Sequence, residues 1–193
     1  MADWNERYSL GEHIKGEPQP LLARAVKKLE PGRALDLACG AGRHAIFLAE
    51  HGWRVTAVDA SIVGIELAQI EASKRGVEVD WRVADLESGE FEIEAEGYDL
   101  IAVFYYLQRD LFPGIRAGVR AGGTVVAAIH TVDQSPDMRP QNPAFLLRPG
   151  ELRAEFNGWE ILHYYEGAPT EDGHQRNTAE IAARKVRSDR QEK

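Results

Sequence analysis

The feature that most constrains the fold of this chain is an alternation of short apolar, β-branched runs with longer amphipathic segments. The alternation is typical of parallel strands, because each parallel connection must cross back over the sheet and usually does so as a helix. We therefore predict an α/β fold in which helices fill the gaps between five parallel strands. The predicted strands are residues 34–37, 54–58, 79–83, 99–104 and 124–129.

The last third of the chain has a different pattern. Residues 159–165 and 178–186 are two strand-like runs, and the polar stretch between them shows no helical periodicity. Such a pair predicts a β-hairpin. Before it, Pro149 and Gly158 bracket a short segment with the start and stop signals of a helix, which we place at residues 149–156.

The length of 193 residues suits one domain with its own core. We predict a single domain over residues 1–187 and a flexible tail over residues 188–193. The longest apolar runs, such as residues 100–107, are far shorter than a membrane span, and the polar N-terminus does not resemble a secretory signal. The single cysteine, Cys39, suits a reducing compartment, so we expect a cytoplasmic protein.

The charge pattern bears on the partners. The net charge is -8 and no block of Lys or Arg stands out, so the sequence lacks the basic surface expected for binding phosphate backbones. We therefore expect a small-molecule partner rather than nucleic acid or membrane. No metal site is predicted, and the sequence does not indicate an oligomeric state.

A glycine-containing loop follows the first predicted strand. It contains Gly40 and Gly42, and the predicted helix over residues 43–51 comes directly after it. Glycines at this point allow a tight turn and let a ligand approach the backbone. Because Gly40-x-Gly42-x-x-Ala45 also satisfies the dinucleotide fingerprint, an NAD-dependent oxidoreductase is one alternative.

Three carboxylates distinguish the alternatives. Asp36 precedes the glycines, Asp59 ends the second predicted strand and Asp85 follows the third. In an open α/β sheet the ligand crevice lies at the carboxyl ends of the strands, so the three side chains should converge there. Asp36 would repel a pyrophosphate, whereas a ligand that carries an ammonium, a sulfonium and a ribose would be held. S-adenosylmethionine fits this description.

The segment DLACGAGRHAIFLAEHGWRVTAVD resembles the first two motifs of class I methyltransferases, in particular small-molecule enzymes related to the tellurite-resistance methyltransferases. The resemblance continues in order through Ala84-Asp85-Leu86, Tyr98-Asp99-Leu100-Ile101 and Ala121-Gly122-Gly123. It implies a Rossmann-like, seven-stranded, mostly parallel sheet flanked by helices, with an antiparallel last strand. It also implies an enzyme that uses S-adenosyl-L-methionine.

Carried over to this chain, the resemblance implies a role for each residue of the cofactor site. The backbone of Gly40 and Gly42 would contact the methionine part, Asp59 the ribose hydroxyls, and Asp85 with Leu86 the adenine. Asp36 would orient the loop, in which Ala38 replaces the glycine of many relatives. The remaining residues that we expect to border the cofactor are Arg43, Ala60 and Phe104.

The N-terminus carries Trp4-x-x-Arg7-Tyr8, which resembles a segment that folds over the cofactor in such enzymes. We therefore assign Trp4 and Tyr8 to the cofactor site and residues 1–20 to an N-terminal lid. An equally weighted alternative is that these residues only anchor the segment to the surface.

The acceptor is expected near the ends of strands four and five. Phe104 should lie in the core, and Tyr105 or Tyr106 should line the acceptor pocket, because successive strand residues face opposite ways. His130 ends the fifth predicted strand as a general base or as a packing residue. His174 and Arg176 lie in the hairpin loop, which should turn over at the acceptor entrance. Cys39 is expected to be a small buried group without a catalytic role.

These features predict transfer of a methyl group from S-adenosylmethionine to a small-molecule acceptor by in-line displacement. Two alternatives belong to other classes: the NAD-dependent oxidoreductase, and a non-catalytic module that binds S-adenosylmethionine without turnover.

Overall fold

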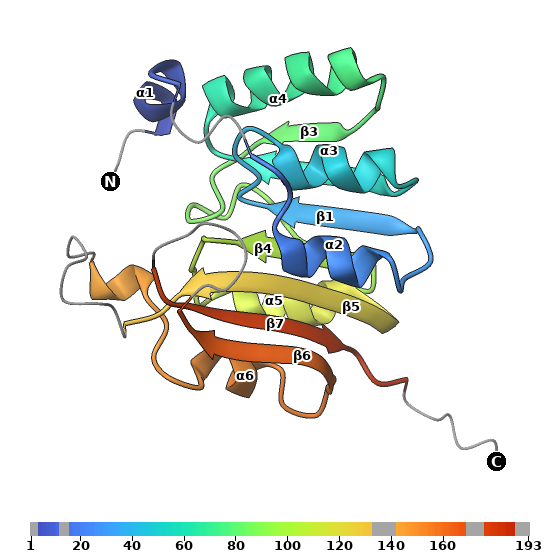
Figure 1. Ribbon diagram of the computed structural model, residues 1–193, viewed down its shortest axis with the longest axis vertical. Coiled ribbons are helices and arrows are strands. Elements are labelled where there is room, and N and C mark those ends of the chain that lie inside the picture. Colours follow the sequence, from blue (N-terminus) through green and yellow to red (C-terminus); the bar gives the residue numbers. More distant parts are fainter. Residues whose placement is uncertain (1–3, 12–15, 133–141, 169–175, 188–193) are drawn as a thin grey trace.

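In the computed structural model, seven strands form one sheet in the order β3-β2-β1-β4-β5-β7-β6 (Figure 1). The structure describes residues 4–11, 16–132, 142–168 and 176–187. β7 pairs antiparallel with both β5 and β6, and the other pairings are parallel, so β7 is the one reversed strand of this sheet. This confirms the predicted topology. The strands are β1 (Arg33–Leu37), β2 (Arg54–Asp59), β3 (Asp80–Val83), β4 (Tyr98–Phe104), β5 (Val119–His130), β6 (Glu160–Gly167) and β7 (Thr178–Arg184).

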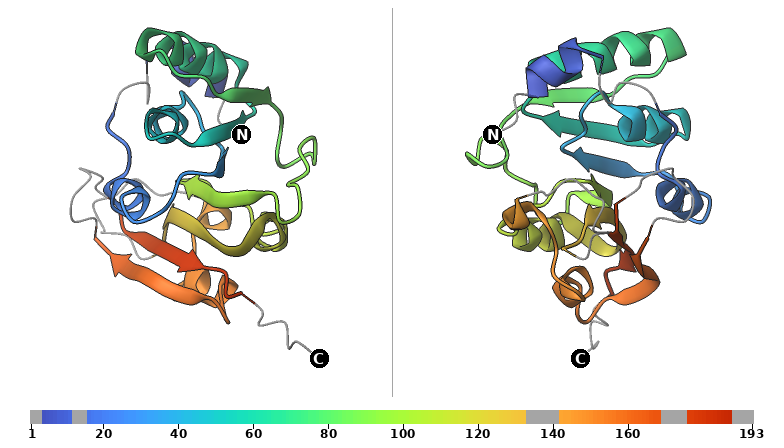
Figure 2. Two further views of the ribbon diagram at one scale, coloured as in Figure 1. Left: turned by 90° about the vertical axis from the view of Figure 1, so that its right-hand side faces the viewer. Right: turned by 60° about the vertical axis from the view of Figure 1, so that its left-hand side comes forward.

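Helices cover both faces of the sheet (Figure 2). One face carries α2, α3 and α4, the other carries α5 and α6, and α1 lies against α4. The crossovers predicted after strands one, two and four are therefore confirmed. The helices of the described chain are α1 (Trp4–Ser9), α2 (Pro20–Val26), α3 (Arg43–Glu50), α4 (Ile62–Arg75), α5 (Leu111–Gly118) and α6 (Glu151–Glu155), with a 3-10 turn at Pro143–Phe145.

The hydrophobic core has two parts, one on each face of the sheet. Strand residues alternate between them: Ala34 contributes to the α3 side and Leu35 to the α5 side. The strands β1, β4 and β5 are buried on both faces and therefore read as nearly continuous apolar runs. This burial fixes the carboxyl end of β1, where the glycine loop begins.

The prediction that helices fill all the gaps is wrong between β3 and β4. Residues 84–97 form turns and extended backbone without a helix. Phe91 and Ile93 pack on the α5-side core, and glutamates alternate with them. This spacing of two puts the apolar side chains on one side of an extended segment, whereas a helix would scatter them around its axis.

The N-terminal region contains two helices that the sequence pattern did not predict. Gln19 caps α2 by accepting a hydrogen bond from the Leu21 amide at 2.6 Å, and Pro20 occupies the first helical position. The later elements agree with the prediction: β6 and β7 form the expected hairpin, and α6 lies inside residues 149–156.

Among the described residues, no helix is long and apolar enough to cross a membrane. The same part of the chain contains no group of three or more His, Cys, Asp or Glu side chains that could hold a metal ion. The predicted tail, residues 188–193, lies outside the described residues.

Candidate cofactor and acceptor site

The loop between β1 and α3 is built from left-handed backbone conformations. The φ angles are 55° at Ala38, 55° at Gly40 and 80° at Gly42. Glycine adopts such angles without steric cost, whereas an alanine pays about 1–2 kcal/mol. Ala38 therefore carries backbone strain in this chain.

Asp59 joins the glycine loop to the end of β2. Its Oδ2 accepts the Gly40 amide at 2.7 Å, and its Oδ1 accepts the Ser61 amide at 2.8 Å. Desolvation raises the pKa of Asp59, and the two backbone hydrogen bonds oppose that rise. Each carboxylate oxygen retains one free lone pair, so the side chain could still accept ribose hydroxyls.

Tyr8 lies over the glycine loop. A Cβ added to Gly40 would overlap the Tyr8 hydroxyl, and one added to Gly64 would lie 3.0 Å from the Tyr8 ring. Tyr8 is only 7% exposed, and burial raises its pKa. Asn5, on the same helix, accepts a hydrogen bond from the Ser61 hydroxyl at 2.7 Å. The N-terminal segment is thus seated on the loop and on the start of α4.

Trp4 behaves differently from Tyr8. It is 45% exposed, and the Arg7 guanidinium lies 4.5 Å from its ring centroid. This arrangement agrees with the surface-anchor alternative for Trp4 and Arg7, while Tyr8 is the residue of this segment that reaches the loop.

Asp36 lies beneath the loop and is 1% exposed. Desolvation raises its pKa to about 8; a hydrogen bond from the Ala45 amide and the charge of Arg43 act in the opposite direction. Burial thus opposes the negative charge by which we expect Asp36 to repel a pyrophosphate.

The residues expected to border the adenine lie just after the ends of β3 and β4. Asp85 is half-buried; its Oδ1 accepts the Glu87 amide at 2.9 Å. Gln108 donates to the buried Leu86 carbonyl at 3.1 Å and accepts the Tyr106 hydroxyl at 2.6 Å. This chain of contacts fixes the end of β3 against the segment that follows β4.

A second aromatic group lies at the ends of β4 and β5, where we expect the acceptor. The Tyr105 and His130 ring centroids are 5.1 Å apart, and the Arg43 guanidinium lies 5.7 Å from the Tyr105 ring centroid. Phe104 is buried as predicted and lies 4.1 Å from the His44 ring, centroid to centroid.

The predicted reason for the divergence of Tyr105 and Tyr106 is wrong. β4 ends at Phe104, and Tyr105 adopts a φ of 59°. The two tyrosines face different sides because of this turn and not because of strand alternation. Tyr105 packs with the α3-side core and Tyr106 with the α5-side core.

The remaining predicted residues are placed unevenly. Arg176 precedes β7 and is partly buried, close to the edge that carries His130, since His130 pairs with Thr178. Ala60 is exposed beside Asp59. His174 lies outside the described residues.

The sequence analysis did not identify Asn5, Gln108 and Ser61 as site residues. The sequence around Asn5 and Gln108 offers no local signal. Ser61 had a usable signal, because it is the N-cap of α4.

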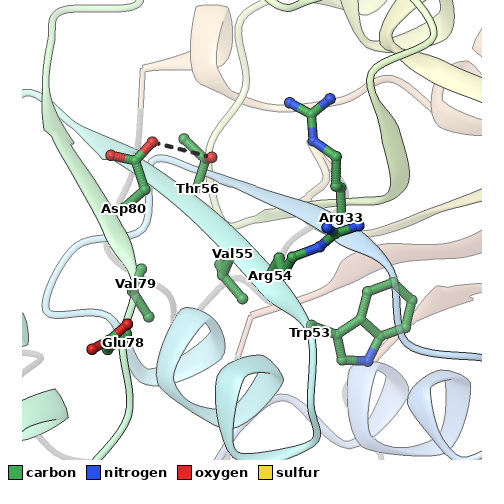
Figure 3. A pocket seen from close by; sticks show the side chains of 8 residues that line it. All are labelled: Arg33, Trp53, Arg54, Val55, Thr56, Glu78, Val79 and Asp80. Atoms are coloured by element: carbon green, nitrogen blue, oxygen red, sulfur yellow. Dashed lines mark hydrogen bonds between the residues drawn. The ribbon is translucent and has the colours of Figure 1, made fainter.

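A separate hollow of about 470 Å³ lies at the amino ends of the strands, opposite the end that carries the glycine loop (Figure 3). Residues from the amino ends of β1, β2 and β3 line it. It is therefore remote from the glycine loop. Its lining residues are Arg33, Trp53, Arg54, Val55, Thr56, Glu78, Val79 and Asp80.

The site fits an S-adenosylmethionine-like ligand on two observations. The positive φ angles of Gly40 and Gly42 form a backbone turn at the carboxyl end of β1, where ligands of open α/β sheets bind. The buried Oδ2 of Asp36 has no hydrogen-bond partner among the described residues. A ligand with a polar amino-acid part could bind at the turn and satisfy the carboxyl oxygen.

Comparison with known proteins agrees with this fit. The family model described as "Tellurite resistance protein TehB" matches residues 6–185. The "Probable S-adenosyl-L-methionine-dependent methyltransferase TehB" of Haemophilus influenzae is 27% identical over 150 residues, which cover 74% of this chain and 51% of that protein. A "Ubiquinone biosynthesis O-methyltransferase" of Methylocella silvestris is 36% identical over 124 residues, or 62% of this chain and 48% of the relative.

The comparison with solved structures concerns the fold. The crystal structure of TehB from Haemophilus influenzae superposes with a TM-score of 0.72 at 22% identity, covering 94% of this chain and 67% of that one. The chain spans about half the length of the curated relatives it matches. Because the family model covers nearly all of its residues, the chain belongs to the TehB family.

Proposed function

We propose that this chain transfers a methyl group from S-adenosyl-L-methionine to a small-molecule acceptor by in-line displacement. The observation that carries the proposal is the glycine turn held by Asp59 at the carboxyl ends of β1 and β2. Ligands of open α/β sheets bind at this edge. The names of the relatives from Haemophilus influenzae and Methylocella silvestris support the same activity.

Each part of the site has a role in this proposal. The Gly40 and Gly42 backbone, with Arg43 nearby, holds the amino-acid part of the cofactor, and Asp59 with Ala60 holds the ribose. Asp85 and Leu86 border the adenine, and Tyr8 covers the loop from above. The cofactor supplies an electrophilic methyl group on a sulfonium whose thioether leaves without needing a proton.

The chain's contribution to the rate is therefore mainly orientation and exclusion of water. Holding two reactants in line can supply roughly 7–11 kcal/mol. Tyr105 and Tyr106, on the two sides of the β4 end, form walls beside the acceptor. His130, next to Tyr105, takes the proton when the acceptor atom is a protonated oxygen or nitrogen; an anionic acceptor needs no base.

A small molecule is the proposed acceptor, because the chain has a net charge of -8. Such a charge disfavours a phosphate backbone as partner. The O-methyltransferase relative acts, by its name, in ubiquinone biosynthesis, which fits a small acceptor.

Calorimetric titration with S-adenosylmethionine, its demethylated product and NADH tests the cofactor assignment. We expect binding of the first two and none of NADH. Binding of NADH alone would favour the oxidoreductase. Turnover is then followed as formation of the demethylated product with a panel of hydroxyl, amine, thiol and chalcogen oxyanion acceptors. Cofactor binding without turnover on any acceptor would favour the non-catalytic module.

A further inference from the structure

A third glycine of the site lies outside the glycine loop. Gly64 is buried in the first turn of α4, where its amide donates to the hydroxyl of Ser61, the N-cap residue, at 3.1 Å. Its φ angle is not positive, so an alanine could adopt the same backbone conformation. Alanine is also favoured over glycine inside a helix. The reason for a glycine at this position must therefore be the space around its Cα.

The ring of Tyr8, on α1, fills the space beside Gly64. A Cβ added to Gly64 would lie 3.0 Å from Cε2 and 3.2 Å from Cδ2 of this ring, and 3.2 Å from the Gly40 carbonyl oxygen. A Cβ added to Gly40 would meet the hydroxyl, Cζ and Cε1 of the same side chain. The two glycines thus face opposite edges of the ring and form a socket, which leaves Tyr8 only 7% exposed.

Contacts of Asn5 hold α1 over this socket. The Asn5 Oδ1 accepts the Ser61 hydroxyl at 2.7 Å and the Val63 amide at 3.4 Å. α1 packs against α4, as Figure 1 shows. All of these contacts join residues of the chain itself, so Tyr8 can occupy the socket before any ligand binds.

The seated Tyr8 lies on the approach to the glycine loop. Its hydroxyl covers the face of Gly40 that a ligand would contact in the proposed function. Burial raises the pKa of Tyr8, and the nearby charge of Asp59, which accepts the Gly40 amide, adds to the rise. Tyr8 is therefore close to the backbone that holds the amino-acid part of the cofactor and to the carboxylate that holds its ribose.

We propose that Gly64 is a positioning residue that lets Tyr8 sit on the glycine loop, and that release of Tyr8 from this socket limits how fast S-adenosylmethionine enters and leaves. The inference rests on the proposed function. Gly64 touches no ligand in this proposal and acts through Tyr8 alone. A larger residue at position 64 should weaken the seat, so that α1 opens more often and the cofactor exchanges faster.

The first measurement needs no ligand. Hydrogen exchange of residues 4–11 should be about 5- to 50-fold faster in Gly64→Ala than in the natural chain, because overpacking of a buried contact weakens it to this extent. Exchange in α2 should not change. Gly114→Ala, inside α5, is the matched control, because its Cβ would lie at an ordinary 3.5 Å from Ile93. Equal exchange of residues 4–11 in all three proteins would overturn the role of Gly64.

A second measurement tests whether Tyr8 is the group that Gly64 accommodates. Gly64→Ala should lower the melting temperature of the natural chain. In a Tyr8→Ala background the same change should keep or raise the melting temperature, because alanine favours the helix and the Gly40 carbonyl at 3.2 Å is the close neighbour that remains. A loss of equal size in both backgrounds would show that the carbonyl, and not Tyr8, requires the glycine, and would overturn the proposal.

The third measurement concerns the exchange of the cofactor. In stopped-flow mixing followed by tryptophan fluorescence, the observed rate of S-adenosylmethionine binding to the natural chain should level off at high concentration, because opening of α1 precedes binding. Gly64→Ala should raise this limit and the dissociation rate by the factor seen in hydrogen exchange, whereas a merely structural defect would not speed entry. Unchanged rates in this variant would overturn the control of exchange.

The three measurements separate the inference from the proposed function. If S-adenosylmethionine binds to neither the natural chain nor the variants, the proposed function and the control of exchange both fail. The coupling of Gly64 to Tyr8 is then still decided by hydrogen exchange and by the melting temperatures, which need no ligand.

Discussion

The amide of Gly40 and the carboxylate of Asp59 are joined by a 2.7 Å hydrogen bond. The bond links the carboxyl ends of two adjacent parallel strands, since β1 and β2 pair from Arg33 and Arg54 to Leu37 and Val58. The shape of the glycine loop and the position of the proposed ribose ligand are therefore not independent. Removing Asp59 should disturb both.

Asp59→Ala is expected to weaken binding of S-adenosylmethionine by about 10- to 100-fold, because a charge-assisted hydrogen bond contributes roughly 1.5–3 kcal/mol. Asp59→Asn keeps one oxygen acceptor and should lose less. Calorimetry measures both constants, and circular dichroism checks the fold. Asp80→Ala, at the amino end of the exposed β3, is the matched control and should bind normally. Unchanged affinity in a folded Asp59→Ala protein would contradict the ribose assignment.

Gly40→Ala should weaken cofactor binding for two separable reasons. The φ of 55° strains an alanine, and the added methyl group overlaps the Tyr8 hydroxyl. Tyr8→Ala removes the overlap but not the strain, so the effects of Gly40→Ala and Tyr8→Ala should not add. A double-mutant cycle on the affinity for S-adenosylmethionine measures the coupling. Gly76→Ala, at a φ of 67° in open space, is the control for strain alone and should leave cofactor binding unchanged.

If the N-terminal segment is a lid, S-adenosylmethionine should slow amide exchange in α1. Tyr8 and Asn5 already touch the loop and Ser61, so a bound ligand would add contacts on the same side. Hydrogen exchange compares residues 4–11 with α6, which packs on β7 and should not respond. Deletion of residues 1–8 should reduce affinity. Equal exchange with and without ligand would leave only the anchor interpretation for this segment.

The buried Asp36 should make the protein less stable as pH rises. Its folded pKa of about 8 lies above the ordinary value of 3.8, so between these values the native state holds a proton that the unfolded state has lost. The free energy of unfolding should therefore fall by up to about 1.4 kcal/mol per pH unit from this group. Urea unfolding between pH 6.5 and 8 should show a shallower decline for Asp36→Asn. Parallel curves for the two proteins would show that Asp36 is ionised in the native state.

The sequence predicted the sheet well because strands buried on both faces leave a strong apolar signal. The prediction of parallel strands also placed Asp36, Asp59 and Asp85 at one edge, since the carboxyl ends of parallel strands lie at the same edge of a sheet. The prediction of a crossover helix was wrong for residues 84–97. There, Phe91 and Ile93 alternate with glutamates, a pattern that indicates extended backbone, but we gave more weight to the expected crossover.

The chemical state of the site was less accessible from sequence. The charge on Asp36 depends on its burial under α3, and the contact of Tyr8 with Gly40 joins residues far apart in the chain. Neither leaves a local pattern. Likewise, the turn at Tyr105 has a positive φ at a residue that is not glycine, so the sequence gives no sign of the turn. The placement of the two tyrosines was therefore predicted from the wrong geometry.

The last prediction concerns the acceptor. Arg176 lies just before β7, and the first residue of that strand, Thr178, pairs with His130. A guanidinium here offers a rigid fork for an anionic acceptor. Arg176→Ala should therefore lower kcat/KM for such an acceptor and leave the affinity for S-adenosylmethionine unchanged.

The control for Arg176→Ala is Arg187→Ala. Arg187 follows the same strand but lies beside Gly122, near the amino end of β5, far from the glycine loop. This variant should keep both constants, because it removes an equal charge from the opposite edge of the sheet. If Arg176→Ala and Arg187→Ala turn over an anionic acceptor equally well, the hairpin loop is not part of the acceptor site. If only Arg176→Ala loses kcat/KM while still binding the cofactor, the loop recognises the acceptor through its charge.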